Sequence, residues 1–139
     1  MKRSVKIVAL MLLLVMAFTA LVSCSRLSGT YVSSDGTMIV FDGENYTYTT
    51  KVGETPVEFK GTYKIKNDGE DSLIFLLKEE QSVDGTPKKL ENPTYIGGDN
   101  DGTEFGLNYA KGEYEVVLEN GSTVTKEYIV VGTIRYTKQ

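Results

Sequence analysis

Few side chains in this 139-residue chain can do chemistry. Cys24 is the only cysteine, and the chain has no histidine. Most activated nucleophiles depend on a neighbouring base, so these two facts exclude the common nucleophile–base pairs. Carboxylate pairs remain as acid–base groups, but Glu113, Glu115 and Glu119 alternate with apolar residues, as the solvent-facing side of a strand does. The residues predict no catalytic constellation, and we expect the protein not to be an enzyme.

Cys24 ends a hydrophobic N-terminal segment. Lys2, Arg3 and Lys6 make a positive start, and residues 7–22 form a nearly unbroken apolar run. This is the plan of a secretory signal. A transmembrane anchor is the alternative, but the run is slightly short for the roughly 20 residues that a bilayer requires.

The sequence Leu21-Val22-Ser23-Cys24 resembles the lipobox of bacterial lipoproteins. The resemblance implies that residues 1–23 are a helical lipoprotein signal peptide that is cleaved off. It also implies that Cys24 carries a diacylglycerol on its thiol and becomes the first residue of the mature chain. Each buried methylene contributes ~0.8 kcal/mol, and two or more acyl chains hold a protein stably on a membrane.

This reading predicts an exported protein that is lipid-anchored at a membrane. Ser25 follows the cysteine, and it is not the Asp that signals inner-membrane retention in some Gram-negative bacteria. We therefore expect the outer membrane or the cell surface if the envelope has two membranes.

The mature chain, residues 24–139, is long enough for a single domain with one core, with 24–26 as a short tether. Residues 1–23 hold three of the 15 basic residues and none of the 19 acidic ones, so the mature net charge is −7. Nucleic-acid binding requires clustered Lys and Arg, and we expect none. No cofactor is predicted.

Short Gly/Asp/Asn clusters divide the mature chain into runs rich in Val, Ile, Thr, Tyr and Phe, the pattern of strands joined by tight turns. No segment has the period of an amphipathic helix. We predict about eight antiparallel strands, near 27–33, 37–42, 45–51, 56–66, 72–79, 103–109, 113–119 and 123–137. Residues 81–98 are the one long connection, and their two prolines argue against a central strand.

The pattern apolar-x-Gly-Thr-bulky occurs three times, around Gly29, Gly61 and Gly132. Glycine within a strand marks a bend or a close approach of another backbone, and closed sheets place such glycines where strands curve. We therefore predict an all-β fold that is an up-and-down barrel, with a β-sandwich as the alternative.

The opening Gly29-Thr30-Tyr31 resembles the Gly-x-Trp that begins lipocalin and other calycin barrels, with Tyr31 in place of Trp. The chain thus resembles the small bacterial lipoproteins with a lipocalin-like domain. The resemblance implies an eight-stranded barrel, with or without a ligand cup. Those families also pack an Arg of the last strand near the aromatic residue, and Arg135 lies in that strand. However, the alternation of residues 124–136 places Arg135 on the outer face.

Five tyrosines fall on predicted inner faces and are the candidate ligand-lining residues: Tyr31, Tyr63, Tyr114, Tyr128 and Tyr136. They either fill the barrel, which eight strands just permit, or line a cup at its mouth. Lys126 is the one charged residue on the predicted inner face of its strand, and we expect its ammonium to lie at the mouth.

Two further features bear on binding. Asp99, Asp101 and Glu104 resemble a calcium loop at first sight, but the spacing fails the EF-hand pattern. An acidic hairpin is the favoured reading, and we predict no metal site. The strands 37–41 and 73–77 are apolar on both faces, so both need cover, from the 81–98 connection, a second subunit or an envelope protein.

Two functions remain open. The protein is either a lipid-anchored envelope protein that binds a small apolar or amphiphilic ligand in a barrel cup, or a surface interaction or inhibitor protein. In the second case a filled barrel docks a protein partner. An internal cavity of several hundred cubic ångströms would favour the first, and a filled barrel with exposed apolar strands would favour the second.

Overall fold

The computed structural model describes residues 26–68 and 71–139. Nine strands make up the fold: β1 (Gly29–Ser33), β2 (Met38–Asp42), β3 (Asn45–Val52), β4 (Thr55–Asp68), β5 (Asp71–Val83), β6 (Thr86–Tyr95), β7 (Leu107–Val117), β8 (Thr123–Val131) and β9 (Ile134–Lys138). No helix in the described part of the chain is long and apolar enough to span a membrane. The predicted signal peptide and Cys24 lie outside the described residues.

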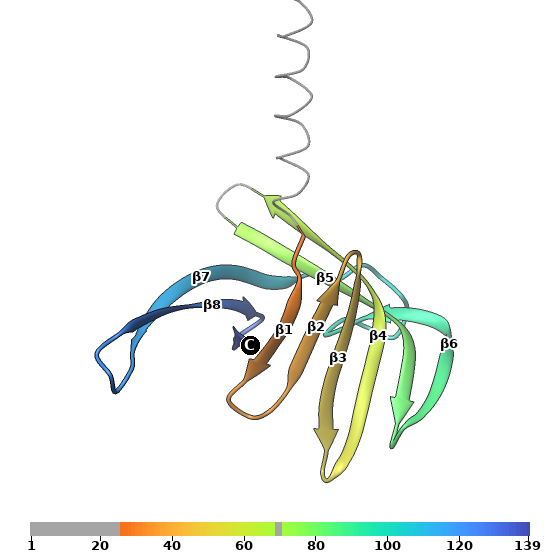
Figure 1. The fold of residues 1–139 in the computed structure, drawn as a ribbon. Helices are drawn as coiled ribbons and strands as arrows, with labels where there is room; N and C mark the ends of the chain where they lie inside the picture. Colours follow the sequence, from red (N-terminus) through yellow and green to blue (C-terminus); the bar gives the residue numbers. More distant parts are fainter. Residues whose placement is uncertain (1–25, 69–70) are drawn as a thin grey trace, which may run out of the picture.

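Eight of these strands close into an antiparallel barrel, in the order β1-β2-β3-β4-β5-β7-β8-β9 and back to β1. The predicted all-β barrel is therefore confirmed (Figure 1). The ninth strand, β6, pairs with the second half of β5 and forms an edge outside the ring. The ring closes between β5 and β7 through two residue pairs, Leu73 with Asn108 and Ile74 with Leu107.

The strands alternate sides and bury one face, as period-2 patterns require. The core contains mainly aromatic and branched side chains from β1 to β9, joined by Leu27 just before β1: Leu27, Tyr31, Ile39, Phe41, Tyr46, Tyr63, Ile74, Leu76, Ile129, Val131 and Tyr136. Tight turns set the register of the hairpins. Asp84 and Gly85, which join β5 and β6, both have positive φ, the conformation of a type I′ turn.

Three predicted strands have the wrong bounds. Residues 103–109 and 113–119 are not separate strands, because residues 110–112 continue β7 instead of turning. The segment 123–137 is not one strand, because Gly132 with a φ of 66° turns the chain between β8 and β9.

The segment 81–98 is not a long connection either. It contains the end of β5 and most of β6, and the two prolines lie in β6. Proline lacks the N–H of a ladder bond, so it is tolerated on an edge strand.

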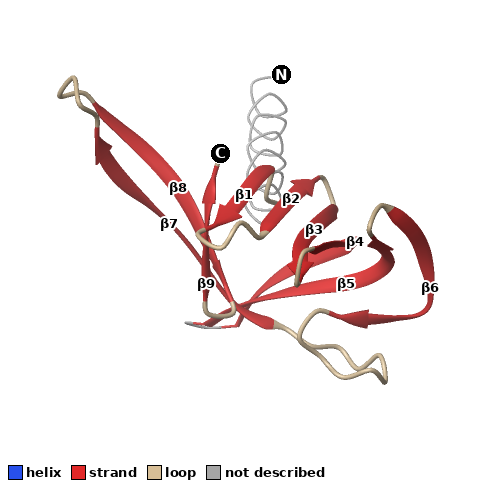
Figure 2. Ribbon diagram, turned by 90° about the horizontal axis from the view of Figure 1, so that it is seen from below, coloured by secondary structure: helices blue, strands red, loops and turns tan. Residues whose placement is uncertain are grey.

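The β7–β8 hairpin extends well beyond the barrel wall (Figures 1 and 2). Strand β9 pairs with β8 only from Tyr128 to Val131, and β5 pairs with β7 only at Leu107 and Asn108. Residues 113–127 therefore pair only with each other among the described residues. We call these residues the ribbon.

Candidate functional site

Aromatic and aliphatic side chains pack together in the core of the barrel. The ring of Phe41 contacts the edges of Tyr31 and Tyr63, with ring centroids 5.7 Å and 4.8 Å apart. Such edge-to-face pairs contribute roughly 0.5–1.5 kcal/mol beyond the area they bury. Tyr31, Tyr63 and Tyr136 point into this core, as predicted, and each is at most 9% exposed.

Leu27 is fixed at one end of the barrel. Its backbone N–H donates to the Tyr63 hydroxyl oxygen at 2.8 Å, and that hydroxyl lies 3.2 Å from the Leu27 carbonyl oxygen, to which it donates. The side chain of Leu27 is buried in the core. The backbone of Leu27, three residues after Cys24 in the sequence, is thus held to the barrel.

Burial raises the pKa of several core tyrosines. Loss of solvent raises the pKa of Tyr109 to about 12 and also raises the pKa values of Tyr46 and Tyr136. A phenolate would be costly in this apolar interior. These hydroxyls therefore stay neutral at physiological pH, as hydrogen-bonding groups of a packed core.

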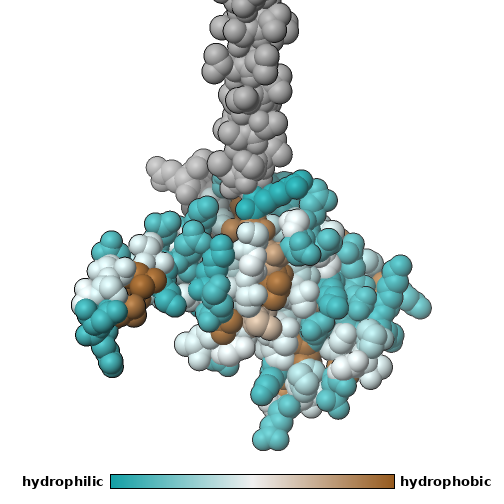
Figure 3. Space-filling view, in the orientation of Figure 1, coloured by the Kyte–Doolittle hydropathy of each residue, from teal (hydrophilic) through white to brown (hydrophobic). Residues whose placement is uncertain are grey.

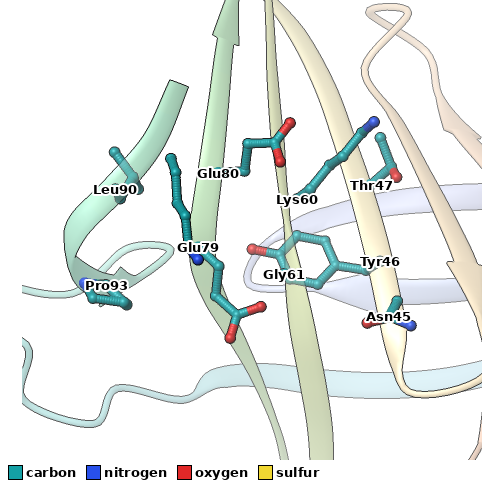
Figure 4. A pocket seen from close by; sticks show the side chains of 10 residues that line it. Asn45, Tyr46, Thr47, Lys60, Gly61, Glu79, Glu80, Leu90 and Pro93 are labelled. Carbon is teal, nitrogen blue, oxygen red and sulfur yellow. The ribbon is translucent and has the colours of Figure 1, made fainter. Parts of the chain in front are cut away.

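Strand β5 is irregular where it faces Gly61 of β4. The register between β4 and β5 shifts between Lys60 and Tyr63, and the Tyr46 ring lies across Gly61 so that its hydroxyl donates to the Leu77 carbonyl at 3.0 Å (Figure 4). A Cβ on Gly61 would lie 1.8 Å from that carbonyl oxygen. Glycine is therefore required here by a close backbone approach, as the sequence pattern predicted.

A half-open pocket of about 530 Å³ lies beside this stretch. Figure 4 shows Glu79 and Glu80 from β5 and Lys60 from β4 on its walls. Leu90 and Pro93 of the edge strand line its far side. Charged groups of both signs line an opening that exposes them to water, so the pocket lacks the apolar enclosure typical of small-molecule sites.

A smaller pocket of about 300 Å³ lies at the end of the barrel where the ribbon leaves it. Leu27, Tyr31 and Ile129 line it with apolar surface, and Glu113 and Glu127 line it with carboxylates. Its volume lies at the lower limit of the range of roughly 300–1,000 Å³ found for ligand pockets. Among the candidate tyrosines, Tyr31 and Tyr128 border this pocket.

Tyr114 and Tyr128 do not point into the barrel, contrary to prediction. Ile129 and Val131 occupy the core, so their neighbour Tyr128 faces the outside. The prediction read β8 and β9 as one strand with a single phase, whereas the turn at Gly132 reverses the chain and resets the alternation. Tyr114 follows Tyr128 to the outer face, because their rings lie 6.1 Å apart across β7 and β8.

Arg135 stacks on the outer face of Tyr128, with its guanidinium carbon 4.2 Å from the ring centroid. Tyr31, by contrast, lies inside against Phe41. The pairing of Arg135 with the first-strand aromatic that the lipocalin resemblance implies is therefore not formed.

The ribbon has two unlike faces. On one face Tyr114 lies opposite Lys126, and Val116 lies opposite Val124; we call this the tyrosine face. On the other, the acidic face, Glu113 lies opposite Glu127, Glu115 opposite Thr125 and Val117 opposite Thr123. Lys126 therefore lies on the outer side of the ribbon and not at the mouth of the barrel.

Apolar side chains at the tip of the ribbon are open to solvent. Val117 is 71% exposed, Leu118 43% and Val124 40%, and Figure 3 shows apolar surface on this projection, at the left of the view. An isolated two-stranded hairpin is at best marginally stable in water. A hairpin that exposes both faces and keeps branched apolar residues at its tip is typical of an interaction surface.

Residues 96–106 cover the outer face of β5. Phe75 is buried there: its ring lies 2.8 Å from where a Cβ on Gly106 would be, and its ring centroid is 6.3 Å from that of Tyr95 at the end of β6. The Glu104 carboxylate lies 2.8 Å from Lys64 Nζ and 3.3 Å from Lys66 Nζ. This segment therefore provides the cover predicted to be needed by strand 73–77, although it lies mostly after the 81–98 connection.

The acidic residues of this segment have local partners. The Thr103 N–H donates to Asp101 at 2.9 Å, and Glu104 binds the two lysines. Hydrogen bonding from Lys64 lowers the pKa of Glu104. Among the described residues, no group of three or more His, Cys, Asp or Glu side chains is arranged to hold a metal ion.

The chain was compared with protein-family models, curated proteins and solved structures, and none of them matches.

Proposed function

We propose that this protein is a lipid-anchored interaction protein of the bacterial envelope, in which the barrel is a filled scaffold and the ribbon is the surface that docks a protein partner. The observation that carries the proposal is the exposed tip of the ribbon, with Val117 71% exposed. The packed aromatic core favours the outside of the barrel over its inside as the binding surface.

Anchoring fits this role. Acylation of Cys24 would place the barrel within a few residues of the membrane, because Leu27 is hydrogen-bonded to Tyr63. The ribbon would then project from a fixed point on the membrane surface toward soluble or membrane-bound partners. The acidic mature chain would resist sinking into anionic head groups.

Photo-cross-linking in the envelope of the producing cells tests the proposal. A benzophenone amino acid replaces Val117 or Val124 in the full chain, and a third chain carries it at Glu54, an exposed position in the turn between β3 and β4. We expect one discrete protein adduct from Val117 and Val124 that excess soluble domain suppresses, and none from Glu54. Equal adduct patterns from all three positions, or none, would contradict the proposal.

A small amphiphile in the pocket beside Leu27 and Tyr31 is the second candidate function, favoured by the apolar floor of that pocket. Native mass spectrometry of the domain purified from its own cells tests it. A stoichiometric small molecule that is lost in an Ile129→Glu variant would support the ligand function. Mass spectra of the bare chain alone would exclude it.

A further inference from the structure

The ribbon carries an unpaired strand edge. From Tyr109 to Val117, strand β7 pairs with β8 on one side, and no described residue pairs with its other side, because β5 ends its pairing at Asn108. The corresponding free stretch of β8 is shorter, from Thr123 to Glu127. An unpaired edge is a template onto which another strand can be added.

The register determines which backbone groups of β7 bond to β8 and which face the free edge. Leu118 N–H donates to the Ser122 carbonyl, and Gly132 N–H donates to the Asn108 carbonyl. Antiparallel pairs alternate between bonded and non-bonded, so even-numbered β7 residues direct their N–H and C=O groups to β8. The N–H groups of Lys111, Glu113, Glu115 and Val117 therefore face the free edge.

The edge of β6 shows the contrast. Pro87 and Pro93 interrupt it, and the neighbouring Lys88 and Lys89 are exposed. Prolines and lysines are the residues by which natural sheets prevent addition of further strands. The free edge of β7 has no proline and a single lysine, Lys111, so its backbone N–H groups remain able to form hydrogen bonds along most of its length.

Resting on the function proposed above, we infer that the free edge of β7 accepts an extended segment of the partner as an added strand, and that this segment carries two basic residues spaced by one apolar residue. Residues directly opposite in a sheet share a face. The basic side chains would lie opposite Glu113 and Glu115, and the apolar side chain between them would join Tyr114 on the tyrosine face.

A second copy of the chain fits this edge less well than a basic strand. Two β7 strands paired symmetrically about Tyr114 would place Glu113 opposite Glu115 of the other copy. Pairing centred on Gly112 would place Glu113 opposite Lys111 but would leave Glu115 opposite Tyr109, without a basic partner. Like charges directly opposite are destabilising. Complementary charge thus favours a basic partner strand.

The test uses a defined probe, the peptide acetyl-Thr-Val-Lys-Val-Lys-Val-Thr-amide, titrated calorimetrically into the mature domain. The peptide with Glu in place of Lys is the control. We expect the Lys peptide to bind about five times more tightly, because it forms two attractive cross-strand pairs where the Glu peptide forms two repulsive ones. Equal affinity of the two peptides would overturn the predicted partner chemistry.

Two proline variants identify the edge. Glu113→Pro removes an N–H that faces the free edge of β7 without removing a bond between β7 and β8. Thr125→Pro makes the matched change on the free edge of β8. We expect Glu113→Pro to lower the affinity for the Lys peptide about tenfold or more, because the variant loses one backbone hydrogen bond and the register of the added strand. We expect Thr125→Pro to keep its affinity for the Lys peptide within about twofold of the unchanged domain. The reverse order would overturn the assignment to β7.

Charge reversal gives a result that unfolding cannot imitate. In the double variant Glu113→Lys and Glu115→Lys we expect the preference to invert, so that the Glu peptide binds more tightly than the Lys peptide. An unchanged preference for the Lys peptide would overturn the inference. Circular dichroism confirms that each variant is folded before titration.

The outcomes separate this inference from the proposed function. Adducts from Val117 and Val124 that persist in Glu113→Pro would leave the ribbon as the docking surface and overturn strand addition. Sedimentation of the isolated domain as a dimer that Glu113→Pro dissociates would show a second copy on the edge, and would likewise overturn the inference.

Discussion

Glu113 lies directly opposite Glu127 at the point where the ribbon leaves the barrel. Glu127 is held by Lys138 at 3.2 Å, whereas Glu113 forms no ion pair with the described residues. Two carboxylates in one cross-strand pair repel each other, so the folded domain retains a local cost at the base of its proposed docking edge.

Glu113→Lys is therefore expected to stabilise the isolated domain by about 0.2–1 kcal/mol, because an attractive pair replaces a repulsive one. Urea unfolding at neutral pH measures this. Glu115→Lys is the matched control. Glu115 lies opposite Thr125, so its substitution relieves no repulsion between two carboxylates. Equal effects of the two substitutions would show that the Glu113–Glu127 relationship has no energetic consequence.

Gly61→Ala is expected to destabilise the domain by about 3 kcal/mol or more, because overpacking against rigid backbone is costly. The new Cβ would meet the Leu77 carbonyl, which cannot move without breaking its bond from Tyr46. Gly43→Ala is the control: nothing lies within 4 Å of its Cβ position, and its positive φ costs about 1–2 kcal/mol. Thermal unfolding of both variants should rank Gly61→Ala as the less stable, and the opposite order would contradict the close approach.

The domain is expected to lose stability between pH 10 and about pH 12. Burial raises the pKa of Tyr109 to about 12, above its ordinary value of 10.0, so the unfolded chain releases this proton first. Below pH 10 both states are protonated and stability is unaffected. Stability then falls until the folded-state pKa is passed. Circular dichroism should show the loss of folded structure over this range, and tyrosinate absorbance showing all tyrosines ionised near pH 10 in the folded protein would contradict the buried placement.

The ion pairs of Glu104 with Lys64 and Lys66 are expected to make the cover over Phe75 sensitive to acid. The pKa of Glu104 is lowered in the folded state, so its contribution is present above the unfolded pKa, about 4.3. It is lost as the pH falls through the folded pKa. The amide protection factors of residues 96–106, which correct for the intrinsic pH dependence of exchange, should fall on acidification, and Glu104→Gln should abolish that fall. An unchanged acid response in the variant would show that groups other than Glu104 cause the effect.

Cys24→Ala is expected to release the protein from membranes, because acyl chains on this thiol supply the predicted anchor. Membrane fractionation and intact-mass analysis of the mature product test this. Ser25→Ala is the matched control and should still be cleaved and acylated. A cleaved, acylated product from Cys24→Ala would exclude the lipoprotein assignment.

The sequence predicted a barrel, but not for all the right reasons. Only Gly61 of the three patterned glycines marks a close approach inside the barrel wall. Gly29 has a positive φ at the start of β1, and Gly132 has one in a turn. The expected strand number agreed with the ring because one strand was split at residues 110–112 and two were merged at Gly132.

Alternation specifies a face only while the chain keeps its direction. Tyr31 and Tyr63 were placed correctly because β1 and β4 are continuous strands with a clear phase. Tyr128 was misplaced because Gly132-Thr133 was read as part of a strand, although the same two residues suit a two-residue turn. A turn hypothesis at Gly132 would have corrected the phase of all of β8.

The ribbon could not be predicted as a projection. Its length depends on where β5 and β9 stop pairing, and these are long-range relationships that the local pattern does not contain. The sequence does indicate an exposed apolar tip. Val116, Val117 and Leu118 precede a turn, and three consecutive apolar residues there break the alternation expected of a strand with one buried face.

Amide hydrogen exchange of β7 tests the central claim most directly. In the free domain the N–H groups of Glu113 and Glu115 should exchange faster than those of Tyr114 and Val116, which bond to β8. Saturation with the Lys peptide should protect Glu113 and Glu115 and leave Thr125 unchanged. Protection that is already complete without peptide, or that arises at Thr125 instead, would contradict strand addition at this edge.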